Sequence, residues 1–192
     1  MKRAEEIYRE ILFQGMERKI SNLTQSYLAR ALGVSLSIVN LALKPLKKMN
    51  AVRIKQRSFD VIDKRKILYY WASVRNIEKD IIYKTRAEKP VKQIEAEMPA
   101  DVVYAAYSAY KFKFRDVPAD YSEVYIYSDN IKEIEKRFPK NNKTPNLFVL
   151  KKDKNLKEPT LALIFVDLWN LKEWYAKDFL KAVEARLNGI LE

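Results

Sequence analysis

Thr24 to Asp63, TQSYLARALGVSLSIVNLALKPLKKMNAVRIKQRSFDVID, is the stretch that decides the fold of this chain. Thr24 can cap a short helix, and Gly33 can end it because glycine enters the left-handed backbone region at little cost. Ser35 can then cap a second helix. Pro45 lies inside that second helix and predicts a kink or an end there, since proline has no backbone N–H to donate.

The second helix has an apolar side and an outward side. Two short helices joined by a tight turn cross steeply, and in a helix-turn-helix the second helix presents its outer side chains to base edges in the major groove. The apolar side consists of Ile38, Val39, Ala42, Leu43 and Leu46. The residues expected to face outward are Leu36, Ser37, Asn40, Leu41 and Lys44.

A basic hairpin is predicted directly after this helix. Residues 51–56 (AVRIKQ) and 59–62 (FDVI) alternate apolar and polar residues, as strands do, and Arg57 with Ser58 can make the turn. Cations on such a hairpin are suited to DNA phosphates or a minor groove. The basic residues expected there are Arg53, Lys55 and Arg57, with Lys47, Lys48, Lys64 and Arg65 nearby.

The order of turn, helix and hairpin resembles the winged helix-turn-helix superfamily, and the run LARALGVSLSIVN (28–40) carries most of the likeness. The resemblance implies a sequence-specific, DNA-binding transcriptional regulator. More weakly, the whole chain resembles AbiEi-type abortive-infection antitoxins through PADVVYAAYSAY, SEVYIY and ALIFVDLWNLKEWYAKDFLKAV. That likeness implies a repressor of its own operon. The alternatives are a plain helical hairpin in a larger core, and a winged-helix module that joins proteins.

The positive charge is concentrated in one part of the chain. Residues 1–75 hold 16 Lys or Arg against 6 Asp or Glu, a surplus of ten, whereas residues 76–192 hold 21 against 19, a surplus of two. A phosphate-binding surface concentrates charge in this way. We therefore predict an α+β protein with a DNA-binding domain at 1–75 and a small mixed α/β domain at 76–192 that ends in a long helix.

Composition narrows the functions further. The 192 residues include no Cys and no His, which removes disulfides, thiolate zinc sites and the commonest general base. No apolar run is long enough for a membrane span, and the charged start MKRAEEIYRE does not look like a signal peptide, so a cytoplasmic protein is expected. Three glycines and abundant Lys and Glu indicate adaptation to high temperature.

The second domain is expected to alternate strands and helices. Strands are predicted at 80–85, 121–127, 147–151 and 161–166, and helices at 91–98, 101–110, 130–138 and 167–187, where Asp167 acts as the cap. In the first domain, further helices are expected at 2–16 and, capped by Asp63, at 64–75. Together these elements predict a small mixed sheet covered by helices.

The sequence of the second domain shows no pattern typical of a catalytic or metal site. The carboxylates of Asp116, Asp120, Glu123, Asp129 and Asp167 have no spacing that matches a metal or acid-base site, and there is no glycine-rich phosphate loop. We therefore expect no enzyme activity, no cofactor and no metal. The second domain is expected to sense a ligand, to form a homodimer or to bind a partner protein.

Overall fold

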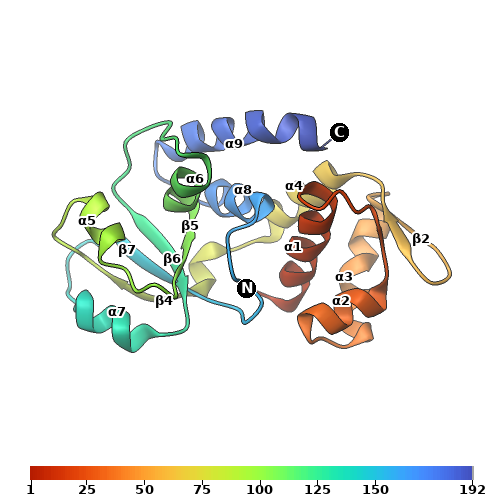
Figure 1. The fold of residues 1–192 in the computed structure, drawn as a ribbon, viewed down its shortest axis with the longest axis horizontal. Helices are drawn as coiled ribbons and strands as arrows, with labels where there is room; N and C mark the ends of the chain where they lie inside the picture. Colours follow the sequence, from red (N-terminus) through yellow and green to blue (C-terminus); the bar gives the residue numbers. More distant parts are fainter. Residues whose placement is uncertain (192) are drawn as a thin grey trace. The chain divides into compact units, whose positions relative to one another are not determined.

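The computed structural model describes residues 1–191 and has a mixed α+β fold with two small sheets (Figure 1). Its helices are α1 (Arg3–Met16), α2 (Gln25–Leu32), α3 (Leu36–Lys48), α4 (Lys64–Val74), the 3₁₀ helix η1 (Ile77–Asp80), α5 (Val91–Ala96), α6 (Ala106–Phe114), α7 (Ile131–Arg137), α8 (Leu161–Trp169) and α9 (Ala176–Leu191). Its strands are β1 (Asn22–Leu23), β2 (Val52–Ile54), β3 (Phe59–Val61), β4 (Ile81–Thr85), β5 (Val103–Ala105), β6 (Val124–Ser128) and β7 (Leu147–Lys151).

The chain divides into two compact units. Unit 1 contains residues 1–75, 160–166 and 184–192, and unit 2 contains residues 76–159 and 167–183. The sequence places the boundary at Arg75 and assigns everything after it to one domain. In the structure two short C-terminal segments group with the N-terminal residues instead.

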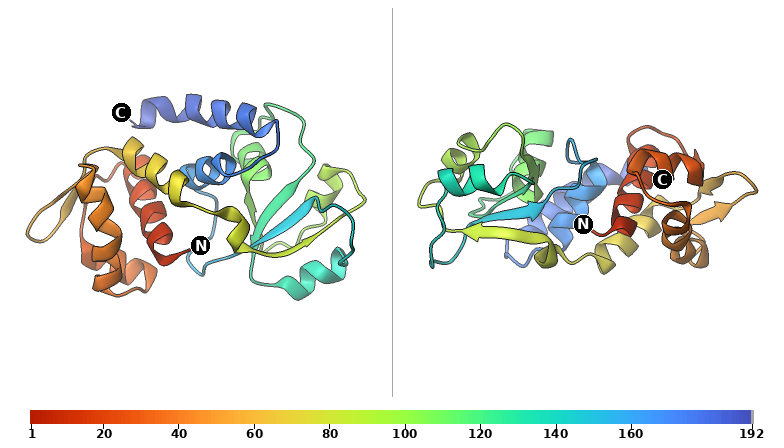
Figure 2. Two further views of the ribbon diagram at one scale, coloured as in Figure 1. Left: turned by 180° about the vertical axis from the view of Figure 1, so that it is seen from behind. Right: turned by 90° about the horizontal axis from the view of Figure 1, so that it is seen from below.

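Unit 1 is built around the helices α1, α2, α3 and α4 and a three-stranded antiparallel sheet of order β1-β3-β2. Apolar residues spaced three and four apart, such as Ile7 and Ile11 of α1, are completely buried, as in an amphipathic helix that faces a core. The hairpin formed by β2 and β3 extends away from these helices in both views of Figure 2. Within this sheet β3 pairs with both β1 and β2, so of the two hairpin strands only β2 lies at an edge of the sheet.

One buried ion pair joins the first helix to the end of the fourth. The Arg75 guanidinium donates to the Glu5 carboxylate over 3.0 Å, and the side chains of these two residues are only 0% and 4% exposed. The indole N–H of Trp71 donates to the same Glu5 oxygen over 3.4 Å. The Arg75 guanidinium and the Trp71 indole therefore both stabilise the Glu5 carboxylate, whose burial without partners would be unfavourable.

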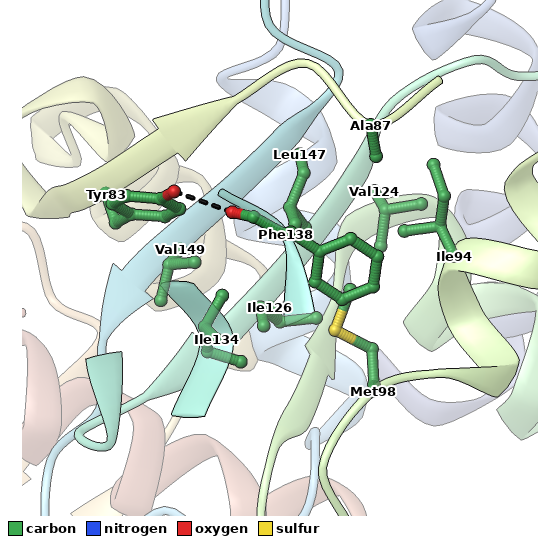
Figure 3. Close-up of a cluster of buried hydrophobic side chains, with 10 residues drawn as sticks. All are labelled: Tyr83, Ala87, Ile94, Met98, Val124, Ile126, Ile134, Phe138, Leu147 and Val149. Carbon is green, nitrogen blue, oxygen red and sulfur yellow. Dashed lines mark hydrogen bonds between the residues drawn. The ribbon is translucent and has the colours of Figure 1, made fainter. Parts of the chain in front are cut away.

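Unit 2 contains a four-stranded mixed sheet of order β4-β7-β6-β5, in which only β6 and β7 run parallel. On one face, strand residues pack with Ile94 of α5 and Ile134 of α7 (Figure 3). The Tyr83 hydroxyl donates to the carbonyl oxygen of Phe138 over 2.7 Å within this cluster. The prediction of a small mixed sheet covered by helices is confirmed.

Tyrosine side chains dominate the opposite face of the sheet. Tyr125 and Tyr127 of β6 point there, and the Tyr107 ring of α6 contacts the Tyr125 ring at a centroid distance of 6.3 Å. The ring of Phe179 in α9 lies 4.9 Å from the Tyr107 ring. These rings bring large apolar areas together in edge-to-face geometry, which aromatic pairs favour.

The predicted helix at 101–110 is wrong. Residues 103–105 form strand β5, which pairs antiparallel with β6, and the helix begins only at Ala106. Ala106 has a φ of 47°, an uncommon left-handed value for a residue with a Cβ. The chain turns there from strand to helix, and the alternating burial of residues 103–105 is the period-two signal that the tyrosine-rich pattern concealed.

The predicted long C-terminal helix is confirmed, but its start and the strand predicted at 161–166 are wrong. Residues 161–166 are not a strand but the first part of α8. The final helix starts at Ala176 rather than at Asp167. Every side chain from Ala162 to Val166 is at most 1% exposed, so the run carries no amphipathic period that would separate helix from strand. The Thr160 hydroxyl accepts the backbone N–H of Leu163 over 3.2 Å at the start of α8.

Smaller differences concern element ends. Strand β6 begins at Val124 rather than at Tyr121, and β1 was not predicted because two residues carry no periodicity. The predicted helices at 2–16, 64–75 and 130–138 and the strands at 80–85 and 147–151 are present within a few residues. Within residues 1–191, no helix combines the length and the apolar character that crossing a membrane requires.

Candidate nucleic-acid interface

The turn between α2 and α3 is fixed by three local interactions. The Thr24 hydroxyl accepts the Tyr27 N–H over 3.0 Å, and the Ser35 hydroxyl accepts the Ile38 N–H over 3.3 Å, so each helix starts with a side-chain cap. Gly33 ends α2 with φ 62° and ψ 42°, and the N–H of Val34 returns to the carbonyl of Ala29 over 3.0 Å. The caps and the glycine turn predicted from the sequence are confirmed.

Helix α3 has two clearly different sides. Val39, Ala42, Leu43 and Leu46 are at most 2% exposed and lie on the side that packs in unit 1. At 3.6 residues per turn the residues three, four, seven, ten and eleven positions after Ser37 line the opposite side together with it. This outer stripe consists of Ser37, Asn40, Leu41, Lys44, Lys47 and Lys48, all exposed, and Leu36 lies beside it with 50% exposure.

Pro45 does not end α3, which continues to Lys48. A proline at this position leaves the Leu41 carbonyl without its usual helical donor. Leu41 is 60% exposed, so water can reach that side of the helix. The end of α3 is set instead by Asn50, which has a φ of 56° and donates its N–H to the Lys47 carbonyl over 3.0 Å.

The β2–β3 hairpin presents a row of basic side chains. Arg53, Lys55 and Arg57 are all exposed. The N–H of Lys55 donates to the Ser58 carbonyl over 2.8 Å, so the turn is centred on Gln56 and Arg57, one residue earlier than predicted. Arg57 therefore lies at the tip of the hairpin.

The carboxylate of Asp60 partly neutralises this row of basic side chains. The Lys55 ammonium lies 2.6 Å from the Asp60 carboxylate, and the side-chain amide of Asn22 donates to the same carboxylate over 2.6 Å. The hydrogen bond from Lys55 and that from Asn22 lower the pKa of Asp60 below its usual value. Asn22 belongs to β1 and was missed from the sequence, since nothing local indicates that it would meet residue 60.

Lys64 and Arg65, two residues predicted to contact phosphate, lie at the start of α4 and differ in exposure. Arg65 is exposed. Lys64 is half-buried, and its ammonium donates to the carbonyl oxygen of Ile190. Burial, and to a lesser extent the charge of Lys19, lower the pKa of Lys64. Lys64 is therefore engaged within unit 1, which makes it the weakest member of the predicted set.

The positive charge remains concentrated in unit 1 when the unit is given the residues that the structure assigns to it. The segments 160–166 and 184–192 add Arg186 against Glu184 and Glu192, so the surplus of ten in residues 1–75 becomes nine. Helix α3 itself contains three lysines and no acid. The exposed side of α3 and the hairpin thus form a positive surface with few carboxylates, which is the condition for phosphate binding.

The acidic residues of unit 2 do not form a metal site. Asp167 is not a helix cap: it lies completely buried within α8, and the Tyr127 hydroxyl donates to its two oxygens over 2.9 and 2.8 Å. Asp116 accepts the Tyr110 hydroxyl over 3.1 Å. Among residues 1–191, no three His, Cys, Asp or Glu residues are close enough together to hold a metal ion.

Comparison with protein-family models, curated proteins and solved structures finds no match to this chain. The interpretation of α3 and the hairpin therefore depends on their geometry and charge.

Proposed function

We propose that unit 1 is a winged helix-turn-helix domain and that the protein is a sequence-specific, DNA-binding transcriptional regulator. In this proposal α3 enters the major groove of double-stranded DNA and the β2–β3 hairpin is the wing that contacts the backbone. The observation that supports it most is the outer stripe of α3, which combines the polar residues Ser37 and Asn40 with a run of lysines and lies before a basic hairpin.

The roles follow from side-chain chemistry. An asparagine amide can donate and accept at once, which matches the major-groove edge of adenine, so Asn40 is assigned to base reading together with Ser37 and Lys44. Leu36 and Leu41 can contact thymine methyl groups. Lys47, Lys48, Arg53, Lys55, Arg57 and Arg65 are assigned to phosphates, which position the protein without reading sequence.

A second candidate is a protein-interaction module of the same fold. The exposure of Leu36 and Leu41, at 50% and 60%, favours it, because apolar side chains at the centre of a surface suit a protein partner as well as a base edge. The basic residues around them favour DNA. A module that docks on protein has no need of a surplus of nine charges in one unit.

Selection of bound duplexes from a random pool tests the proposal. The full chain should enrich one short motif over several rounds at about 50 mM salt, where phosphate contacts are strong. Enrichment of a motif separates sequence-specific regulation from general affinity for nucleic acid. If no duplex is retained even at low salt, the protein-interaction module is the better account of the α3 surface.

A further inference from the structure

A cleft of about 790 Å³ opens on the tyrosine-bearing face of the unit 2 sheet. Its residues come from η1, β4, β6, β7 and the segments 140–145 and 170–173, all of which belong to unit 2. The strand register places Lys84, Phe148 and Tyr125 opposite one another on β4, β7 and β6, so their side chains share this face. The volume is within the range of about 300 to 1,000 Å³ that is usual for small-molecule pockets.

The floor of the cleft is a stacked pair of aromatic rings. The rings of Tyr125 and Phe148 lie 4.6 Å apart with an angle of 9° between their planes. Tyr125 is buried, and its hydroxyl donates to the Glu173 carboxylate over 2.8 Å, which fixes the ring. Phe148 is half-buried and lines the cleft. Tyr125 covers one side of its ring, so a ligand ring has to approach from the other side, where Lys84 is the neighbour of Phe148 on β4. A planar ring placed on that side would extend the stack.

The charged residues of the cleft leave a positive remainder. Glu173 keeps its negative charge while it accepts the hydroxyls of Tyr107 and Tyr125 over 3.0 and 2.8 Å. Glu78 is paired with Lys172, and Lys143 is paired with Glu88. Within the described part of the chain, Lys84 and Lys140 are exposed and form no ion pair, and their two charges exceed the one of Glu173, so a net positive charge is available to an anion.

We propose that this cleft binds a small planar aromatic anion. The ring stacks on the side of Phe148 away from Tyr125, and the carboxylate, sulfonate or phosphate of the ligand pairs with Lys84 and Lys140. The site is separate from the α3 surface and from the hairpin, and it does not depend on DNA binding. The function of unit 2 is then to bind a small aromatic anion.

Calorimetric titration of the full chain with three probes tests the proposal: 2-naphthoate, its neutral amide 2-naphthamide, and the non-aromatic cyclohexanecarboxylate. Naphthoate should bind at least about tenfold more tightly than either of the others, since each lacks one of the two recognised features. Equal affinity for naphthoate and its amide, or no detectable binding of naphthoate, would overturn the proposal.

Two variants locate the binding. Lys84→Gln/Lys140→Gln changes only exposed side chains, so it should fold normally and lose at least about tenfold in naphthoate affinity. Lys132→Gln/Lys136→Gln removes the same charge from exposed positions on α7 and should bind as the parent does. Phe148→Ala, checked by thermal unfolding, should also lose binding. Equal affinities for the two lysine variants would place the anion elsewhere and refute the site.

Discussion

The Lys55 ammonium lies 2.6 Å from the carboxylate of Asp60 on the neighbouring strand of the hairpin. A cation proposed to contact DNA is therefore held by an acid of the same protein. Asn22 donates to that acid from β1, so the pair is tied to the three-stranded sheet. Asp60 both orders the hairpin and reduces its positive potential.

Asp60→Asn should strengthen binding to every DNA duplex at low salt. The change removes one negative charge and releases the Lys55 ammonium for phosphate, so the salt dependence should steepen by up to about 0.9 in the slope of log K against log salt. Fluorescence anisotropy with random duplexes across a salt series measures both effects. Unchanged affinity and slope would show that the hairpin stays away from the phosphates.

Arg57→Ala should weaken binding to all sequences alike. Arg57 lies at the exposed tip of the hairpin, where a phosphate contact carries no sequence information. The slope of log K against log salt should become shallower by about 0.9 for one lost contact. Lys154→Ala, an exposed lysine of unit 2, is the control and should leave the slope unchanged. A loss confined to one DNA sequence would contradict the phosphate role.

Asn40→Ala should reduce discrimination between DNA sequences while leaving stability nearly unchanged. Asn40 is exposed on the outer stripe of α3, and alanine is a better helix former than asparagine. A good bidentate base contact accounts for about 1 to 3 kcal/mol of discrimination. The measurement is the ratio of affinities for the selected motif and for random duplex in one buffer. An unchanged ratio removes Asn40 from the base-reading residues.

Glu5→Gln should destabilise the protein strongly. The change removes the buried carboxylate that pairs with the Arg75 guanidinium, and breaking a buried pair in this way costs about 3 to 5 kcal/mol. Urea unfolding followed by circular dichroism gives the loss. Glu133→Gln, which breaks the exposed pair with Arg137, is the control and should leave the midpoint almost unchanged. Similar midpoints for the two variants would mean that Glu5 and Arg75 do not depend on each other.

The sequence predicted α2 and α3 well because their signals are local. Thr24, Gly33 and Ser35 each act within four residues, through caps and a left-handed glycine, and the structure forms all three. The apolar spacing of α3 likewise required only knowledge of the helical period. The exposure of Ser37, Asn40 and Lys44 followed directly from that spacing.

The errors occurred where tertiary pairing or uniform burial decides the structure. Residues 103–105 become a strand because β6 pairs with them, and residues 161–166 are buried on all sides and show no period. The Asn22–Asp60 contact joins residues 38 positions apart. Local patterns carry no information about such partners, so neither the support of the hairpin nor the engagement of Lys64 with Ile190 was predictable.

A charge-matched comparison of two triple variants tests the DNA-binding proposal most directly. One variant, Lys44→Gln/Lys47→Gln/Lys48→Gln, removes the lysines of α3, and the other, Lys132→Gln/Lys136→Gln/Lys154→Gln, removes three exposed lysines of unit 2. Both lower the net charge equally, so general attraction to DNA falls by a similar amount. We expect the α3 variant to lose at least about tenfold more affinity for random duplex at about 50 mM salt. Equal losses would contradict α3 as the DNA-binding surface.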